Sequence, residues 1–274
     1  LQEVVLTWTN GGETDLAGTD IYEAATSGAT TLDNQDRIAL SRNNQFLYVV
    51  ERGNNRVLKF SVGGLFLTRW GTAGTGNGQF ADPIGVVGAP NGNVYVVDND
   101  NDRIQYFNSD GTYLGQWGAA GTGDGQFTDA VDIVIDSLGN VYVTDITALS
   151  ANNRIQKFTS TGTFTAKWTV STILGLAIDS SNNIYVGRNS ASLPLLIYNT
   201  DGTLIQTLGF NFARSAGTGL AVDNSGGIFV TEAQNSVRKY NANGTIVLSF
   251  PVGDGNTNVT AYHYAVDNNY IYVS

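Results

Sequence analysis

The apolar positions of this chain fall into short runs of four or five residues, each with an aromatic residue near its centre. Runs of this kind, rich in Val, Ile, Tyr and Phe and bounded by Gly, Asn, Asp and Ser, predict strands. Six runs carry their aromatic at an equivalent place: Tyr48, Tyr95, Tyr142, Tyr185, Phe229 and Tyr272. Successive aromatics lie 43 to 47 residues apart, so the pattern is an internal repeat.

Each period divides into four strands separated by turns. In residues 84–118 the strands read "IGVV", "NVYVV", "DRIQYF" and "TYLGQWG". The last turn recurs along the chain as "NSDGT", "TSTGT", "NTDGT" and "NANGT", with Gly where a tight hairpin needs a positive φ. A repeated four-stranded unit of about 45 residues is typical of a β-propeller blade. We therefore predict one all-β domain over 1–274, a six-bladed β-propeller of four-stranded antiparallel blades.

The N-terminus is predicted to close the ring, because "EVVLTW", ending at Trp8, resembles the fourth strand "LFLTRW" of the first unit. Residues 1–8 would then be the outer strand of blade 6, with Val4, Leu6 and Trp8 on the side of Tyr272. Residues 9–35 are longer than the other connections and are predicted to form an insertion loop. The remaining segments are predicted as blades 1 to 5 at 36–71, 83–118, 130–169, 173–209 and 217–250, and the start of blade 6 at 261–274.

One strand of blade 6 has no counterpart in the sequence, because nothing like "NRIQKF" follows Tyr272 or precedes Leu1. Three explanations stay open at this point. The natural chain continues past Ser274, or the N-terminal strand pairs directly with the second strand. In the third explanation, another molecule donates the missing strand.

Residues 82–127 resemble an NHL repeat, including the loop "GxGxGQF" that occurs at 74–80 and again at 121–127. The resemblance is close in blades 2 and 3, partial in blades 1 and 5, and weak in blade 4. The His that gives the family its name is absent, since "NDRIQ" and "NNRIQ" stand where "NHRIQ" is expected. The resemblance implies a propeller fold, which in this family and its relatives hosts both enzymes and interaction modules.

The heptad "NDRIQYF" at 101–107 has near copies at 54–60 and 152–158, and each contains an Arg. An acid stands three residues after the aromatic in the preceding strand, and we expect acid and Arg to meet across the hairpin and fix its register. The predicted pairs are Glu51 with Arg56, Asp98 with Arg103, and Asp145 with Arg154. As exposed pairs they would contribute roughly 0–1 kcal/mol each. The alternative is a functional ring of Arg side chains.

Alignment of the innermost strands gives one equivalent position per blade, occupied by Ile38, Gly85, Asp132, Gly175, Gly219 and His263. Glycines suit a place where strands crowd around an axis. Asp132 and His263 fall in opposite blades and are the candidate catalytic acid and base. The alternative is a polar, hydrated channel without chemistry.

The composition limits which metals the chain can bind and whether it can bind nucleic acid. The chain has no Cys and one His, which excludes a Cys/His zinc site, and its net charge of −10 argues against nucleic acid. Asp98, Asp100 and Asp102 alternate as carboxylates of calcium loops do, but the Gly and distant Glu of such a loop are missing. Calcium is thus the one candidate cofactor, with a solvated acidic turn as the alternative. The Gly-rich loops lack the Lys of a phosphate loop.

No apolar run reaches the roughly 18 residues of a membrane span. The absence of Met suggests a processed, exported protein, for which the sequons at Asn243 and Asn258 are suitable. These observations predict a non-enzymatic extracellular propeller that is a structural or interaction module. We expect it to self-assemble into a surface layer or filament through strand pairing and face loops, or to bind another protein or a glycan. The alternative is a metal-dependent propeller lyase or hydrolase with its site at the channel mouth.

Overall fold

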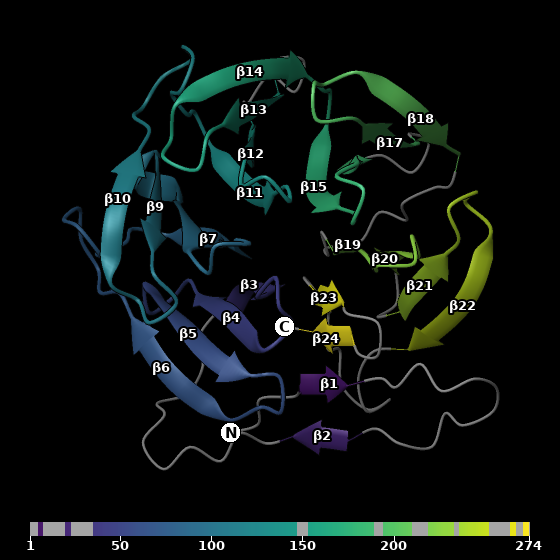
Figure 1. The fold of residues 1–274 in the computed structure, drawn as a ribbon, viewed down its shortest axis with the longest axis horizontal. Helices are drawn as coiled ribbons and strands as arrows, with labels where there is room; N and C mark the ends of the chain where they lie inside the picture. Colours follow the sequence, from purple (N-terminus) through teal and green to yellow (C-terminus); the bar gives the residue numbers. More distant parts are fainter. Residues whose placement is uncertain are drawn as a thin grey trace.

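The computed structural model describes residues 5–7, 20–22, 35–146, 153–188, 194–209, 219–232, 236–251, 264–266 and 271–273. Five four-stranded antiparallel sheets stand around a common axis like the blades of a propeller (Figure 1). In each blade the chain runs from the axis outwards, through four strands in sequence order. Among the described residues, no helix has the length and apolarity to cross a membrane.

The strands of the first three blades are as follows. Blade 1 consists of β3 (Gln35–Leu40), β4 (Phe46–Glu51), β5 (Arg56–Ser61) and β6 (Phe66–Trp70). Blade 2 consists of β7 (Pro83–Gly88), β8 (Val94–Asp98), β9 (Arg103–Phe107) and β10 (Tyr113–Trp117), with the short 3₁₀ helix η1 (Asn99–Asn101) between β8 and β9. Blade 3 consists of β11 (Ala130–Ile135), β12 (Val141–Asp145), β13 (Arg154–Phe158) and β14 (Phe164–Thr169).

The next two blades have the same order of strands. Blade 4 consists of β15 (Ile173–Ile178), β16 (Ile184–Arg188), β17 (Leu195–Tyr198) and β18 (Leu204–Leu208). Blade 5 consists of β19 (Leu220–Val222), β20 (Ile228–Glu232), β21 (Ser236–Tyr240) and β22 (Ile246–Pro251).

The sixth position of the ring holds two two-stranded sheets instead of one four-stranded blade. One pairs β23 (Tyr264–Val266) with β24 (Ile271–Val273), and the other pairs β1 (Val5–Thr7) with β2 (Asp20–Tyr22). β23 lies beside the inner strands β19 and β3, and β1 lies beside β24 (Figure 1). The strand β1 therefore lies beside β24, the last of the described strands, and the ring closes between blade 5 and blade 1.

Two details of the predicted closure are wrong. β1 was expected to be the outermost strand of the sixth position, but it lies between β24 and β2. The outer strand is β2, which comes from the segment 9–35 that was expected to be a loop. Leu6 is opposite Ile21, and Tyr272 is opposite Ala265 in its own sheet. Val4 and Trp8 lie outside the described residues.

The core lies between neighbouring blades. Tyr48, Tyr95 and Tyr142, the aromatics that set the repeat, are almost completely buried. One cluster combines Tyr95 and Ile104 of blade 2 with Phe127 and Phe158, which belong to blade 3 and the loop that precedes it. Outer strands such as β10 alternate between half-buried and exposed residues, since only one of their faces contacts a neighbouring blade. Burial of both faces explains why the middle strands read as continuous apolar runs.

The glycine of the repeated outer turn has a second role besides its conformation. Gly111 has φ +85°, and a β-carbon added to it would lie 2.6 Å from Cδ2 of Trp70 in the preceding blade. Gly162 has the same relation to Trp117. The Trp near the end of the outer strand in blades 1, 2 and 3 therefore packs on the next blade's turn, where a side chain would collide with the indole ring. This contact repeats from blade to blade and fixes their spacing.

Candidate functional site

The Arg of the repeated heptad meets its acid at the end of a hairpin. Arg103 and Asp98 are directly opposite each other in β9 and β8, and Arg103 Nε lies 2.6 Å from Asp98 Oδ2. We expected an exposed pair, and this is wrong: Asp98 is 0% and Arg103 is 7% exposed. The reason is that the loop 72–80, which arrives from blade 1, covers both side chains.

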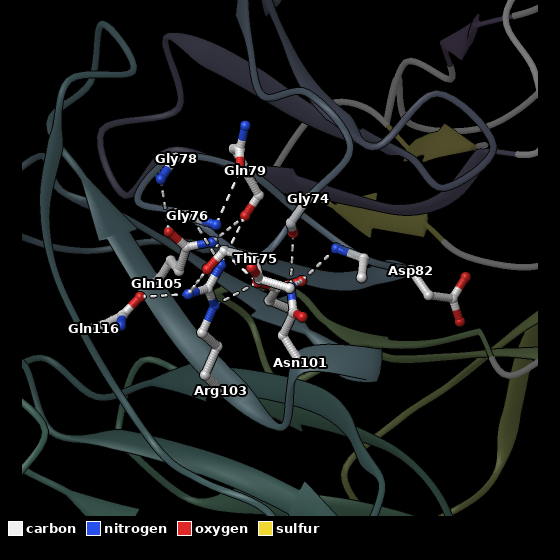
Figure 2. Close-up of polar contacts among 12 residues, drawn as sticks. Gly74, Thr75, Gly76, Gly78, Gln79, Asp82, Asn101, Arg103, Gln105 and Gln116 are labelled. Carbon is white, nitrogen blue, oxygen red and sulfur yellow. Dashed lines mark hydrogen bonds and ion pairs between the residues drawn. The ribbon is translucent and has the colours of Figure 1, made fainter.

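Arg103 donates one further hydrogen bond, from Nη1, to Gln116 Oε1 of β10 at 2.8 Å, and its others to that covering loop. Its Nη1 donates to Thr75 O at 2.8 Å, and its Nη2 donates to Gly76 O and Gln79 O at 2.9 Å (Figure 2). Gln105 continues the same contact, because its Nε2 donates to Gln79 O and its Oε1 accepts from Gly78 N. The planar guanidinium thus acts as a clamp that holds a Gly-rich backbone segment through its carbonyl oxygens.

The carboxylate of Asp98 is fully engaged in the same cluster. It accepts hydrogen bonds from Ala81 N at 2.7 Å and from the side chains of Asn101 and Gln105, besides Arg103. Each of its two oxygens therefore already has donors, which a cation would have to displace.

The other two acids of the predicted calcium loop lie apart from this cluster. Asp100 is exposed in η1, whereas Asp102 follows it with φ 52°. Burial, together with the nearby carboxylates of Asp145, Asp100 and Asp129, raises the pKa of Asp102 above its usual value. Within the described ranges, no group of three or more His, Cys, Asp or Glu is placed to hold a metal ion. Calcium binding by Asp98, Asp100 and Asp102 stays a prediction.

The cluster recurs in blade 3. Arg154 Nε lies 2.8 Å from Asp145 Oδ2, and its terminal nitrogens donate to Thr122 O and Gln126 O in the loop 119–127. Gln156 occupies the place of Gln105 and also donates to Gln126 O. In blade 1, Arg56 contacts Glu51 in the same register. In the two blades that follow a "GxGxGQF" loop, the Arg therefore makes the same contacts with its acid and with the loop.

Asp132 stands on β11, next to the axis, whereas His263, its predicted partner, lies outside the described residues. Its Oδ2 lies 2.7 Å from Arg37 Nη1 of blade 1 and accepts from Leu176 N of blade 4 at 2.7 Å. Its Oδ1 accepts from Ile133 N at 2.8 Å. Both Arg37 and Asp132 are buried. The Asp132 carboxylate therefore connects blade 3 with blades 1 and 4 near the axis.

Sequence reasoning missed Arg37 as the partner of Asp132. The signal was present, because Arg37 directly precedes Ile38, the residue that aligns with Asp132 in blade 1. A basic residue next to one equivalent inner position and an acid at another could have been paired across the ring.

A cavity of about 360 Å³ runs along the axis from this ion pair. Inner strands of the five blades and β23 line it, and most of the lining residues are aliphatic, although polar atoms contribute more of the surface that faces the cavity than apolar atoms do. Its polar lining residues at the far ends of the inner strands, Arg42, Asn44, Ser180 and Asn224, are exposed. The cavity therefore has an open polar mouth, mostly aliphatic lining residues and a buried ion pair at its other end.

Comparison with protein families and curated proteins gives one match. Residues 127–158 match the family model of the NHL repeat. These residues comprise β11 to β13, with the clamp of Asp145 and Arg154. A search of curated proteins found no match to the sequence.

Solved structures with this fold include two enzymes and a chain of a nidogen/laminin complex. Virginiamycin B lyase from Staphylococcus aureus is 14% identical, with a TM-score of 0.61 over 85% of this chain and 74% of that one. A gluconolactonase from Xanthomonas campestris is 15% identical, with a TM-score of 0.64 over 88% and 83%. A chain of the nidogen/laminin complex is 18% identical, with a TM-score of 0.63 over 91% and 94%. At these identities the likeness concerns the fold, and the chain is a β-propeller that contains an NHL repeat.

Proposed function

We propose that this propeller is a non-enzymatic interaction module that works outside the cell and associates with copies of itself. Its outer strands and the loops of one face would supply the contacts. The proposal rests on one observation, which is that the buried carboxylates near this face are already paired within the protein. Each of three carboxylates forms an ion pair with an Arg and accepts hydrogen bonds from backbone N–H groups: Asp98, Asp145 and Asp132. These carboxylates therefore hold the blades and loops in place.

The loops held in this way are suited to recognition. In the loop 72–80, Thr75, Gly76 and Asn77 are exposed, although Arg103 and Gln105 hold the backbone from beneath. The loop 119–127 repeats this arrangement one blade further on, with Arg154 and Gln156. Exposed loops on a rigid scaffold lose little conformational entropy on binding, which favours specific contacts.

Self-association is supported by apolar side chains on the rim. Leu204 and Ile205 of β18 and Ile246 and Val247 of β22 are each about half exposed or more. The two blades meet here, because Gln206 Nε2 lies 3.4 Å from Ala242 O in the turn before β22. Exposed apolar residues on the edge strands of neighbouring blades are available for contact with another protein.

An external location is supported more indirectly. The sequon Asn243 lies exposed in the turn between β21 and β22, where a glycan would meet no obstruction from the blade. One structural neighbour comes from a nidogen/laminin complex. Fractionation of the source cells tests the location: recovery of the chain only from the cytoplasm would contradict it.

The association is tested by light scattering after size exclusion, with negative-stain microscopy, over a range of concentrations. We expect oligomers that grow with concentration, and we expect Ile205→Lys with Val247→Lys to abolish them. Leu114→Lys, on the outer strand of blade 2, is a matched control at a site 46% exposed. A strictly monomeric wild-type protein at millimolar concentration, or equal effects of the three substitutions, would contradict the proposal.

The second candidate is a metal-dependent lyase or hydrolase at the channel mouth. It is favoured by the place of Asp132 beside an axial cavity and by neighbours that include a lyase and a gluconolactonase. It requires Asp132 to exchange Arg37 and two backbone donors for a cation. Elemental analysis of purified protein, with and without added divalent cations, tests this candidate: a stoichiometric metal that Asp132→Asn removes would favour it over the interaction module.

A further inference from the structure

We propose that the axial cavity binds a small amphipathic carboxylate, with its apolar body between the inner strands and its carboxylate at Arg37. This inference goes beyond the interaction role, which uses the rim and the face loops. It rests on three features of the cavity: its walls, its mouth and the incomplete hydrogen bonding of Arg37.

The walls favour an apolar body. Most lining side chains are aliphatic, and several of them are only half-buried because they border the cavity: Ala39, Val87, Ile178, Val222, Ala265 and Val266. A volume of about 360 Å³ falls at the small end of ligand sites, which span roughly 300–1,000 Å³. Transfer of an alkyl chain from water into this space is favourable by about 0.8 kcal/mol for each CH₂ group that is buried.

The mouth allows a ligand to enter. Arg42, Asn44, Ser180 and Asn224 follow the inner strands of blades 1, 4 and 5, and all four are exposed. Arg42 adds a positive charge at this opening, in a chain whose net charge is −10. An anionic ligand therefore meets one exposed guanidinium at the mouth, although the carboxylates of Asp179 and Asp223 stand beside Ser180 and Asn224 at the same ends of the inner strands.

The inner end supplies the group that recognises the carboxylate. Arg37 is 8% exposed and pairs with Asp132 through Nη1, while its Nε is buried without an acceptor among the residues that the structure describes. Asp132, in contrast, also accepts from Leu176 N and Ile133 N. Donors thus exceed acceptors at this end of the cavity. A buried donor without an acceptor is rare and calls for a water, an ion or a ligand.

The charge balance favours a carboxylate over other head groups. The guanidinium has five N–H donors and a planar shape that matches carboxylates. Two backbone N–H groups also donate to Asp132, which reduces the repulsion that a second carboxylate meets when it approaches Arg37. An alcohol would satisfy one donor without charge, and an amine would be repelled by Arg37 and Arg42.

Titration calorimetry of the whole chain tests the proposal, with octanoate as the probe and with octanol, octylamine and acetate as comparisons. We expect saturable binding of one octanoate per chain and at least tenfold weaker binding of each comparison compound. Equal binding of octanol and octanoate would overturn the role of Arg37, and the absence of octanoate binding would overturn the site.

Variants locate the bound molecule. Ala39→Leu and Val222→Phe narrow the cavity and leave Arg37 and Asp132 in place, so we expect each to weaken octanoate binding at least tenfold. Arg37→Lys keeps one charge beside Asp132 but removes the planar donors, and we expect a similar loss. Leu138→Phe, in an exposed turn outside the cavity lining, is the control. Unchanged affinity in the two narrowed variants would overturn the proposal even if Arg37→Lys does not fold.

Discussion

Arg37 of blade 1 reaches across the axis to Asp132 of blade 3, with 2.7 Å between Nη1 and Oδ2. The two residues are 95 positions apart and belong to blades that do not adjoin in the ring, since blade 2 lies between them. A hydrogen bond from Leu176 N extends the contact to blade 4. The ion pair therefore ties the inner strands together where each sheet would otherwise end at an open edge.

The ion pair predicts a strong effect of Asp132→Asn on stability. The substitution leaves the Arg37 charge buried without its carboxylate, and we expect a loss of about 3–5 kcal/mol in the free energy of unfolding, as for other broken buried pairs. Urea denaturation followed by circular dichroism measures it. The double substitution Arg37→Met with Asp132→Leu removes both charges and should be less destabilising than Asp132→Asn alone; a larger loss in the double variant would argue against this reason.

The clamp predicts that Arg103→Lys loosens the loop 72–80. Lysine keeps the charge next to Asp98 but cannot reach Thr75 O, Gly76 O and Gln79 O together. We expect a loss of about 1.5–3 kcal/mol, typical of hydrogen bonds to charged groups, and faster proteolysis within the loop. Lys167→Ala breaks the exposed contact with Asp124 and should change stability by only about 0–1 kcal/mol. Equal effects of the two substitutions would show that the clamp contributes little.

The contact between Trp70 and the next blade predicts a large effect of Gly111→Ala. Gly92 is a matched control, because it has nearly the same φ, +86° against +85°, but an added β-carbon would meet nothing within 4 Å. Gly92→Ala should therefore lose about 1–2 kcal/mol from its positive φ alone. Gly111→Ala should lose at least about 1 kcal/mol more, because the methyl group overpacks against the indole ring. Thermal unfolding of the two variants measures the difference, and equal Tm values would refute the contact.

Buried tyrosines predict a loss of stability at alkaline pH. Burial, with a smaller contribution from the Asp110 carboxylate, raises the pKa of Tyr48 to about 12. Burial and Asp136 raise the pKa of Tyr142, and burial and Asp179 raise that of Tyr185. Because the unfolded chain ionises near pH 10, the stabilisation is complete below that pH and is lost as pH rises towards the folded-state values.

Phenolate absorbance and circular dichroism, recorded together from neutral to strongly alkaline pH, test this expectation. The absorbance of these tyrosines should rise together with unfolding. Ionisation of all tyrosines near pH 10 with the circular dichroism unchanged would contradict it. Tyr48→Phe should shift the unfolding transition to higher pH, since it removes one ionisable group from the core.

Local signals in the sequence were sufficient to predict the four-stranded blades. Positive φ values occur at Gly111, Gly162, Gly202 and Gly244, the glycines of the repeated turn that was identified as a tight hairpin. Arg103 and Asp98 are five residues apart, so the register of one hairpin brings them together. Such contacts depend on short loops, whose geometry is set by turn residues and by the alternation of side chains.

Contacts between blades could not be read from the sequence in the same way. The pair of Arg103 and Asp98 was expected to be exposed, because nothing in the hairpin indicates that the loop 72–80 folds over it. β2 was missed because a strand of three residues, Asp20–Tyr22, gives almost no pattern of its own and exists through its pairing with β1. In both cases a segment from elsewhere in the ring decides the outcome.

The amino-acid sequence by itself determined the repeat, the four strands of each blade, the turns between them and the partners within each hairpin, because these depend on residues close together in the chain. The tertiary structure decided which charges are buried, that Arg37 meets Asp132, and that an apolar cavity with a polar mouth remains along the axis. These features arise only when the blades close into a ring, since they join residues whose distance is set by the packing of whole sheets and not by the connections between them.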